Sequence, residues 1–529
     1  MKVICVTGGV LSGIGKGITG ASIGAILKAA GYQIFMQKFD GYLNVDPGTM
    51  NPIEHGEVFV TDDGTETDLD IGHYERYIDT NMTKNSSWTT GRIYQEIFER
   101  ERKGEYLGKT VQVISHVASL VKEKIKEGFT QSGADISIVE IGGTVGDMEN
   151  EYLIESVRQL RQELGAENVV FVHLVYVPYL GASKELKTKP AQNSVRDLRS
   201  RGIDPDILVV RADMPVEEDI IRKLSLMCGL PIQCVIPSAT VKSIYEVPVN
   251  YQKHVLGNTL LQALHFPQTQ IDLSKWEQLV DHIQNAKEVK KIAMVGKYVS
   301  LEDAYYSLNE GLKVAGYRKD IKIQIDFVSA EEIEKQGTDM LLGYSGICVP
   351  GGFGTRGIEG MVMAAQFARE NKIPYLGICL GSQIMAIEFA RNVLGYPDAT
   401  SEEFFPDAQH QVIHLMEHQK GIEKKGGTMR LGSYDCALTK GSLAEKVYGK
   451  LQIAERHRHR YEFNNAYRPE FEEKGFLISG TSLDGELAEV VEIKDHPYMI
   501  ATQAHPELKS RPLHPHPLFV GFIEAMKGG

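Results

Sequence analysis

One cysteine and one histidine–glutamate pair are the side chains of this chain best suited to covalent chemistry. Cys379 lies in the stretch 377–381, which reads Gly-Ile-Cys-Leu-Gly, and His505 stands two residues before Glu507. A thiolate can attack an acyl carbon, an imidazole can move the proton, and a carboxylate can orient the imidazole. If the segment 505–507 is extended, both side chains point to the same face. Together they predict a Cys-His-Glu acyl-transfer site, although a lone cysteine is more often a small buried hydrophobe.

The residues around Cys379 predict a strand, a sharp turn and a helix. An apolar run, Ile373–Ile378, leads into the cysteine, and a helical pattern follows from Ser382 to Phe389. Glycines on both sides allow the bend that lifts a nucleophile clear of a sheet. The helix N-terminus beneath it favours a negatively charged sulfur. These elements would therefore position and activate the thiol.

A glycine-rich loop near the N-terminus is the second candidate site. The loop Thr7–Gly17 follows the apolar strand Val3–Thr7 and precedes a predicted helix, Ile18–Ala30. Backbone N–H groups of such a loop, with the helix N-terminus, bind phosphates, and Lys16 would reach the β- and γ-phosphates. The loop departs from the Walker A pattern at its first glycine and at the residue after the lysine. A glycine-rich turn without a ligand is the alternative.

Acidic and basic residues elsewhere would complete a nucleotide site. Asp70 ends a polar stretch, and Glu140 follows the apolar strand Ile136–Val139. Such carboxylates lie near the ligand crevice of an α/β sheet and suit Mg²⁺ bound to phosphates, although singly each is more often a solvated residue. The stretch Lys184–Gln192 holds three lysines within six positions. It is either a solvated face or a second polyphosphate site, and spacing leaves both readings open.

Composition limits the classes of protein that fit. The chain has 529 residues, so two or three domains are expected, and its net charge of −13 without a long basic block argues against nucleic-acid binding. The six cysteines are widely spaced without a Cys-x-x-Cys pair, which suggests neither a disulfide framework nor a zinc cluster. No apolar run reaches membrane-spanning length, and the N-terminus does not resemble a signal peptide. A cytoplasmic protein is expected.

The order of apolar and helical segments predicts an α/β fold with two doubly wound parallel-sheet domains. Val3–Thr7 and Lys291–Gly296 are apolar strands that lead into glycine, as at the start of a sheet. We expect domains at 1–266 and 291–529, with a linker at 267–290. The further predicted strands are Ile136–Val139, Val169–Val177, Ile207–Val210, Cys234–Ile236, Ile323–Val328, Gly346–Val349 and Ile373–Ile378.

Taken together, the motifs resemble the CTP synthase family over nearly the whole chain. The most specific blocks are residues 44–50, 55–60, 68–76, 187–190, 350–354 and 456–462. The resemblance implies an N-terminal P-loop-type synthetase domain that binds ATP and UTP, and a C-terminal class I glutamine amidotransferase domain. It implies ATP-dependent amination of UTP to CTP, the last step of de novo CTP synthesis, with ammonia from glutamine channelled to a phosphorylated UTP intermediate. It further implies Mg²⁺ with ATP, allosteric activation by GTP, feedback by CTP, a homotetramer and possible filaments.

The resemblance also implies roles in the amidotransferase half. Cys379 would form a thioester with glutamine, His505 would serve as base and acid, and Glu507 would orient the histidine. Positions that match the glutamine site are Gly352, Leu380, Gly381, Ser382, Gln383, Glu403 and Arg460, with backbone N–H groups of Gly352 and Leu380 as the oxyanion hole. Pro52, His55 and Val58 match the mouth of an ammonia tunnel. Arg356 and Arg430 lie in blocks that match the GTP response.

In the synthetase half, Lys16 and Lys38 would stabilise phosphoryl transfer from ATP to the uracil oxygen, and Asp70 and Glu140 would hold Mg²⁺. The ATP positions are Gly13, Ile14, Gly15, Lys16, Gly17, Ile18, Asp70, Ala239, Thr240 and Val241. The UTP and CTP positions are Ser12, Asp147, Met148, Glu149, Lys187, Thr188, Lys189, Pro190, Ala191, Gln192 and Lys223. The resemblance thus assigns the lysine-rich stretch to a triphosphate site.

Two other functions compete with this one. A glutamine-dependent ligase with another acceptor would share the amidotransferase half, but the lysine stretch and the block around His55 argue against it. A catalytically weak assembly protein is the second, and the retained Cys379, His505, Lys16 and Asp70 argue against that.

Overall fold

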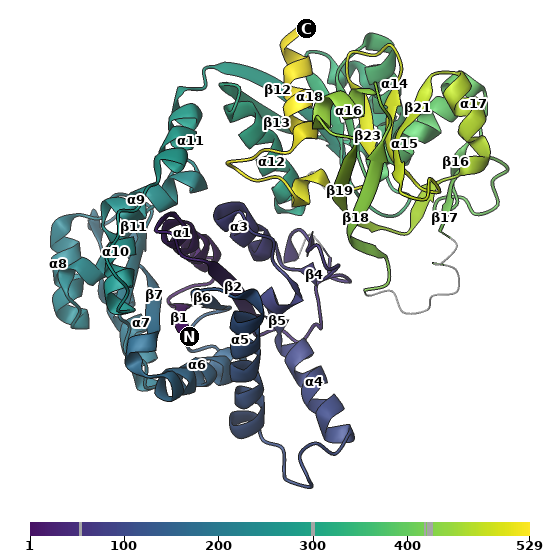
Figure 1. Cartoon of the computed structure of the whole chain (residues 1–529). Helices are drawn as coiled ribbons and strands as arrows, with labels where there is room; N and C mark the ends of the chain where they lie inside the picture. The colour runs from purple at the N-terminus through teal and green to yellow at the C-terminus, as the bar shows by residue number, and fades with distance from the viewer. Residues whose placement is uncertain (52–54, 298–301, 417–418, 420–426, 529) are drawn as a thin grey trace. The chain divides into compact units, whose positions relative to one another are not determined.

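The computed structural model describes residues 1–528 apart from 52–54, 298–301, 417–418 and 420–426 (Figure 1). The chain forms two compact units. The first consists of Met1–Pro47 and Asp70–Asp281, and the second of Gly48–Leu69 and His282–Gly529. A short segment from the first half of the sequence, Gly48–Leu69, therefore belongs to the second unit. No helix among the described residues is long and apolar enough to cross a membrane.

The first unit is built on a parallel sheet whose order, within the described residues, is β11-β10-β7-β1-β6-β2-β5. Every neighbouring pair in it is parallel. Its strands are β1 (Lys2–Gly8), β2 (Ile34–Asp40), β5 (Ser87–Thr89), β6 (Ile136–Ile141), β7 (Val169–Tyr176), β10 (Ile207–Ala212) and β11 (Val235–Ala239). Most of their side chains are buried. Continuous apolar strands of this kind are typical of parallel sheets covered on both faces.

Helices cover both faces of this sheet because successive strand residues point to opposite sides. Val3 and Cys5 of β1 share a core with α4, α5 and α6. On the other face, α1 contacts β1, β2 and β6. The helices are α1 (Lys16–Ala29), α3 (Leu69–Ile78), α4 (Thr90–Arg102), α5 (Ala118–Ser132), α6 (Glu151–Leu164), α7 (Lys189–Ser200), α8 (Glu218–Cys228), α9 (Val247–Lys253), α10 (Leu256–Ala263) and α11 (Ser274–Asn285). A small hairpin pairs β8 (Tyr179–Leu180) with β9 (Glu185–Leu186).

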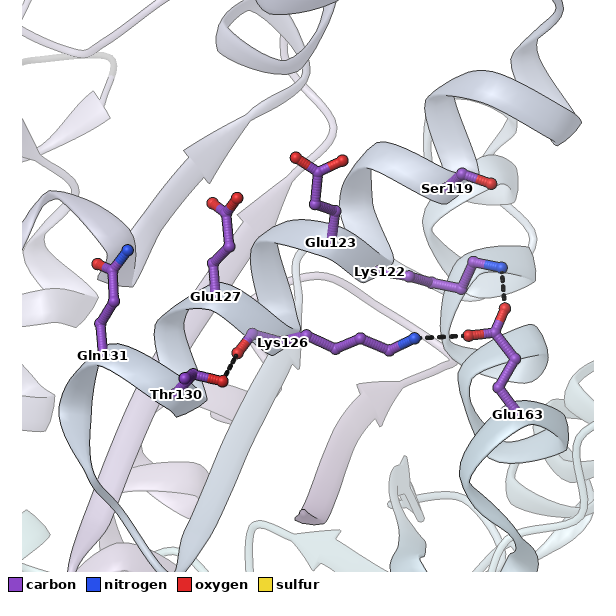
Figure 2. A pocket seen from close by; sticks show the side chains of 8 residues that line it. All are labelled: Ser119, Lys122, Glu123, Lys126, Glu127, Thr130, Gln131 and Glu163. Carbon is purple, nitrogen blue, oxygen red and sulfur yellow. Dashed lines mark hydrogen bonds and ion pairs between the residues drawn. The ribbon is translucent and has the colours of Figure 1, made fainter.

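A shallow groove runs along α5 where it packs on α6. Figure 2 shows Lys122 and Lys126 of α5 pointing to Glu163 of α6. Lys126 Nζ lies 2.7 Å from Glu163 Oε2. The groove is lined by both charge signs, and its lysines are already paired.

The second unit contains a larger sheet of order β13-β12-β14-β15-β23-β22-β21-β18-β19 within the described residues. Its strands are β12 (Glu288–Gly296), β13 (Ile321–Ser329), β14 (Gly346–Val349), β15 (Tyr375–Ile378), β18 (Arg430–Leu438), β19 (Gln452–His459), β21 (Phe476–Ser482), β22 (Ala488–Ile493) and β23 (Met499–Thr502). The half from β13 to β23 is parallel, as predicted. The half from β23 to β19 is antiparallel, which the sequence analysis did not anticipate.

Alternating residues of β12 face two separate cores. Ile292 and Met294 pack with α12 and α18 on one face, and Ala293 and Val295 pack with α13, α14 and α15 on the other. The helices are α12 (Tyr306–Tyr317), α13 (Ala330–Gln336), α14 (Ile358–Asn371), α15 (Leu380–Phe389), α16 (Leu443–Tyr448), α17 (Arg468–Glu473) and α18 (Pro517–Ala525). A small side sheet holds β16 (Thr400–Ser401), β17 (Gln411–Leu415) and β20 (Tyr461–Phe463).

The segment Gly48–Leu69 joins the second unit through a hairpin of β3 (Phe59–Val60) and β4 (Glu66–Thr67). The turn of this hairpin meets β18. Ser433 N donates to Asp62 O at 2.9 Å, and a Cβ on Gly64 would lie 2.9 Å from the carbonyl oxygen of Leu431. The close approach, with φ of +82° at Gly64, favours glycine there.

Candidate active sites

Cys379 occupies a strained turn between β15 and α15, as the strand–turn–helix prediction required. Its φ of 50° and ψ of −100° are unusual for a residue with a side chain. The turn has no space for larger neighbours, since a Cβ on Gly381 would lie 2.1 Å from Val349 O and one on Gly377 2.6 Å from Gly381 O. The glycines therefore allow the bend that presents the sulfur at the carboxyl end of β15.

His505 and Glu507 meet as predicted, but by a different local geometry. His505 Nδ1 lies 2.7 Å from Glu507 Oε1. The segment is not extended, the condition under which the spacing would place both side chains on one face, because β23 ends at Thr502 and Pro506–Leu508 forms a 3-10 turn that directly follows His505. Parallel pairing of Ile378 with Thr502 brings the two strand ends together. The histidine thereby reaches the cysteine turn.

The electrostatic surroundings keep His505 protonated. Burial alone would lower its pKa, but Glu507 and Cys379 outweigh that effect and raise the pKa from 6.5 to about 10. The wall opposite is close, since a Cβ on Gly351 would lie 2.9 Å from His505 Cε1 and 3.5 Å from Cys379 Cβ. The imidazole can therefore act as a proton donor beside the cysteine turn.

A pocket of about 410 Å³ opens over these side chains. It brings together several sequence-predicted residues, namely Val58, Gly352, Cys379, Arg460, His505 and Glu507. Leu380, Gly381, Ser382 and Gln383 form the first turn of α15, directly after the cysteine. Val58 and its neighbours Gly48, Thr49, Met50 and Glu57 come from the segment Gly48–Leu69. This pocket is therefore lined by residues that lie hundreds of positions apart in the sequence.

The other predicted glutamine residues have defined partners. Arg460 donates from Nη1 to Gln419 Oε1 at 2.6 Å and from Nη2 to Thr428 Oγ1 at 3.0 Å. Glu403 Oε1 accepts from Gly354 N at 2.8 Å, and burial raises the pKa of this carboxyl. A guanidinium and a carboxylate so placed suit the two charged ends of an amino acid.

Gln503 contacts the cysteine and was missed by the sequence analysis. Its Nε2 lies 3.6 Å from Cys379 Sγ, and its Oε1 accepts from Gln383 Nε2 at 3.3 Å. It follows β23 immediately, as Cys379 follows β15, and these strands are parallel neighbours. Only the strand pairing could have identified it, because nothing in its local sequence marks it.

The predicted tunnel and effector residues are dispersed over the second unit. His55 Nε2 lies 3.4 Å from Asp68 Oδ2, and Pro52 lies outside the described residues. Arg356 is exposed and donates to Lys297 O at 3.0 Å. Arg430 is buried and its Nη2 lies 2.7 Å from Glu489 Oε1.

In the first unit, the glycine-rich loop leads directly into α1, which begins at Lys16. Val10, Gly13 and Gly15 have φ of 79°, 70° and 94°. Lys16 Nζ donates to Gly143 O at 2.7 Å, which joins the segments that follow the neighbouring strands β1 and β6. A Cβ on Gly17 would lie 2.1 Å from Asp70 Oδ1, which explains why the usual Ser or Thr after the lysine is absent. The loop has the backbone of an anion site.

Lys38, Asp70 and Glu140 form a charge cluster beside this loop. Lys38 of β2 and Glu140 of β6 are register partners, and Lys38 Nζ lies 2.6 Å from Asp70 Oδ2. Burial and the charge of Asp70 raise the pKa of Glu140 to about 8, while Tyr74 OH donates to this carboxyl. Burial opposes ionisation of Asp70 as well, but Lys38 and other cations hold the pKa of its carboxyl well below the usual value. A buried carboxylate and a partly exposed one whose charges repel suit a bound cation.

The other residues predicted to bind nucleotides lie at the end of β11, in loops and turns that follow strands, or in the helices α7 and α8. Thr240 follows β11, and its N–H donates to Ala212 O at 2.9 Å. Lys187 follows β9 and pairs with Glu185, whose carboxyl also feels Lys223. Asp147 Oδ2 accepts from Thr144 N at 2.8 Å, and Met148 is exposed. Ser12 is exposed on the loop, while Thr188, Lys189, Pro190, Ala191 and Gln192 form the start of α7.

Known proteins match this chain over both units. The family model described as CTP synthase N-terminus matches residues 2–266, and that of glutamine amidotransferase class-I matches residues 300–525. The CTP synthase of Caldanaerobacter subterraneus subsp. tengcongensis is 52% identical over 526 residues, which cover 99% of this chain and 98% of the relative. That of Clostridium beijerinckii is 53% identical over 525 residues, covering 99% and 98%. A solved glutaminase domain of Trypanosoma brucei CTPS with bound acivicin is 37% identical and covers 45% of this chain and 94% of that domain, with a TM-score of 0.42.

Matches to both domain models and relatives half identical along the full length settle the family. The chain belongs to the CTP synthase family of glutamine-hydrolysing ligases, which carry out glutamine-dependent CTP formation, the final step of pyrimidine biosynthesis.

Proposed function

We propose that the second unit releases ammonia from glutamine at Cys379 and that the first unit uses it to aminate UTP activated by ATP. The observation that carries the proposal is the strained turn of Cys379 beside a His505–Glu507 pair joined at 2.7 Å, all in one pocket. Strained backbone, an acid and an orienting carboxylate are what a thiol nucleophile needs.

The residues of the pocket have separate roles in this reaction. Cys379 Sγ forms a bond to the amide carbon of glutamine, and the amide nitrogen leaves as ammonia with a proton from His505. Water then attacks the thioester with His505 as base, which releases glutamate and regenerates the thiol. Glu507 keeps the imidazole oriented throughout. Backbone N–H groups of Gly352 and Leu380 would stabilise the oxyanion.

Glutamine would be held by its two charged ends. Arg460 would bind the carboxylate and Glu403 the ammonium, with Gln383 at the start of α15 beside them. Arg460 and Cys379 line the same pocket, which supports this orientation. The amide would then lie over the cysteine turn.

Ammonia is mostly protonated in neutral water and then carries no lone pair for attack, so a shielded route would favour its transfer. We assign Val58 and His55, with Pro52, to the mouth of that route. Val58 lines the pocket that contains Cys379. The acceptor would be UTP phosphorylated on its uracil oxygen. Ammonia would attack the uracil carbon that bears this oxygen, and the oxygen would leave as part of the phosphate.

Lys16 and Lys38 would neutralise the phosphoryl group in transit from ATP. Asp70 and Glu140 fit a hard divalent cation, since both are carboxylates beside the phosphate loop. Burial and the charge of Asp70 raise the pKa of Glu140 to about 8, and a bound cation would offset both effects. When bound, Mg²⁺ would offset phosphate charge at this place. The lysine-rich stretch Lys187–Gln192, with Lys223, would hold UTP, and Ala239–Val241 would lie at the adenine.

Regulation and assembly are proposed here from the resemblance to the family. We assign the GTP response to the region of Arg356 and Arg430, and CTP sensing to Asp147–Glu149. A homotetramer, filament formation and a cytoplasmic location are further proposals on the same basis.

The proposal is tested by following CTP from ATP, Mg²⁺ and UTP with either glutamine or ammonia. We expect CTP from both nitrogen sources. Glutamine should also protect Cys379, but not Cys234, from alkylation, as read by peptide mass spectrometry. CTP formation from ammonia alone, with no protection of Cys379, would contradict the glutaminase assignment.

A further inference from the structure

Arg456 is a buried cation that is not part of the pocket described above. It lies on β19, and its side chain is 0% exposed. Its Nε lies 2.6 Å from Asp62 Oδ1, and its guanidinium carbon is 5.4 Å from the centre of the Phe59 ring. A buried guanidinium is costly unless its donors are satisfied. The hairpin β3–β4 thus supplies the counter-charge for an arginine of β19.

The same arginine contacts the catalytic turn at both of its ends. His505 N donates to the backbone carbonyl of Arg456 at 2.8 Å. Arg456 Nη1 donates to Leu508 O at 3.1 Å. Glu507 lies between these two attachment points, and Leu508 N closes the turn on His505 O at 3.1 Å. The position of the carboxylate that orients His505 therefore depends on where Arg456 lies.

Asp62 is itself held in place by several contacts. Its carbonyl accepts from Ser433 N at 2.9 Å, and Lys509 Nζ lies 3.8 Å from its carboxylate. Lys509 donates in turn to Ala454 O at 2.6 Å, on the same strand as Arg456. The hairpin turn, β18 and β19 are thereby connected around one carboxylate. A carboxylate fixed in this way can hold the guanidinium to one orientation.

We propose that Arg456, anchored by Asp62, is a positioning residue that fixes the 3-10 turn Pro506–Leu508 and so keeps Glu507 on His505. The inference rests on the proposed glutaminase function of Cys379, His505 and Glu507. It gives the segment Gly48–Leu69 a role beyond lining the pocket, since its hairpin completes the support of the catalytic pair. Catalytic geometry tolerates little displacement, and shifts of about 1 Å are known to cost up to about 100-fold in rate.

Arg456→Met tests the proposal, because methionine fills space without a buried charge. Asp62 is one-third exposed and keeps Lys509 nearby, so the substitution strands no buried carboxylate. We expect glutamine-dependent kcat to fall at least about tenfold, with KM for glutamine nearly unchanged and ammonia-dependent CTP formation intact.

Arg391→Met is the matched control. Arg391 Nη1 lies 2.6 Å from Glu359 and its Nε donates to Ala399 O at 2.7 Å, so it also joins a carboxylate to a backbone carbonyl. It lies in the same unit, after α15, and touches neither His505 nor Glu507. Its variant should keep the wild-type glutamine reaction.

A pH profile separates positioning from general stability. Loss of the proton from His505 should set the alkaline limb of the glutamine reaction, and the charged groups that face this imidazole are Glu507, Cys379 and the buried His457. If Glu507 is displaced, the limb moves to lower pH in Arg456→Met and stays in place in Arg391→Met. Arg456→Lys, which restores one charged contact, should recover part of both losses.

Asp62→Asn is a second variant, which leaves Arg456 in place. We expect it to fold, so it keeps the test available should Arg456→Met fail to fold. It should shift the limb in the same direction with a smaller loss of kcat. The inference would be overturned, with the proposed function intact, if Arg456→Met, Asp62→Asn and Arg391→Met all had the same glutamine kinetics and the same alkaline limb of the pH–rate profile. Glutamine hydrolysis that survives Cys379→Ala would instead overturn the proposed function itself.

Discussion

The two candidate active sites lie at the carboxyl ends of parallel strands, yet they differ in what holds them together. The site of the first unit is crowded with charge, since the buried Lys38 and Glu140 are register partners and Lys38 pairs with the partly exposed Asp70. The site of the second unit depends on a strained turn at Cys379 and one ion pair, His505–Glu507. The first should therefore fail when charge is changed, and the second when shape or orientation is changed.

The largest effect should come from Lys38→Met. This substitution removes the cation that lies 2.6 Å from Asp70 and 3.4 Å from Asp40. CTP formation should fall about 1,000-fold with glutamine and with ammonia alike, because phosphoryl transfer precedes both. Steady-state assays with each nitrogen source provide the measurement.

Lys122→Met is the control for that experiment, because Lys122 is also a part-buried lysine paired with a carboxylate, in the groove of Figure 2. It should retain wild-type rates. If Lys38→Met lost only the glutamine reaction, the assignment of Lys38 to phosphoryl transfer in the first unit would be contradicted.

Glu507→Gln should affect the glutamine reaction alone, by about 100-fold or more, since an orienting carboxylate is lost. The amide no longer raises the pKa of His505, so the alkaline limb of the pH profile should move down from about 10. Rates against pH with glutamine, and again with ammonia, provide the comparison. An unmoved limb would mean that Glu507 does not set the protonation of His505.

The two sites should differ in how much stability they lose when a glycine of their loop is replaced by alanine. Gly381→Ala places a Cβ 2.1 Å from Val349 O and should lower the free energy of unfolding by about 2 kcal/mol or more. Gly15→Ala meets no atom within 4 Å, so it should cost only the strain of its φ of +94°, about 1 kcal/mol. Chemical denaturation of both variants measures the difference. A larger loss of unfolding free energy in Gly15→Ala than in Gly381→Ala would contradict the expectation that the cysteine turn is the more tightly packed loop.

The smallest effect should be a pH dependence of stability. The pKa of His505 rises from 6.5 to about 10 on folding, so its ion pair stabilises fully below about pH 6.5 and loses this contribution as the pH rises through 10. The difference in unfolding free energy between wild type and Glu507→Gln should be of order 1 kcal/mol at pH 6 and should vanish above pH 10. Paired denaturation curves at the two pH values test this, and a difference independent of pH would contradict it.

Local sequence was sufficient for features that depend on neighbouring residues. The turn at Cys379, the start of α1 at the phosphate loop and strands such as β1, β6 and β15 follow from apolar runs and glycines, whereas β2, β5 and β23 were not predicted. Features that depend on distant partners were not predictable in this way. The hairpin around Asp62 joins the second unit through Arg456, nearly four hundred positions away, and Gln503 reaches Cys379 only because β15 and β23 are neighbours. The 3-10 turn at Glu507 likewise depends on its tertiary contacts with Arg456.

The central claim is that one chain divides its reaction between a thiol site and a phosphate site. CTP formation by Cys379→Ala, with glutamine and separately with ammonia, tests it most directly. The account predicts that the glutamine reaction is abolished and that the ammonia reaction continues at close to the wild-type rate. Loss of both reactions in a folded Cys379→Ala protein, or survival of the glutamine reaction, would contradict it.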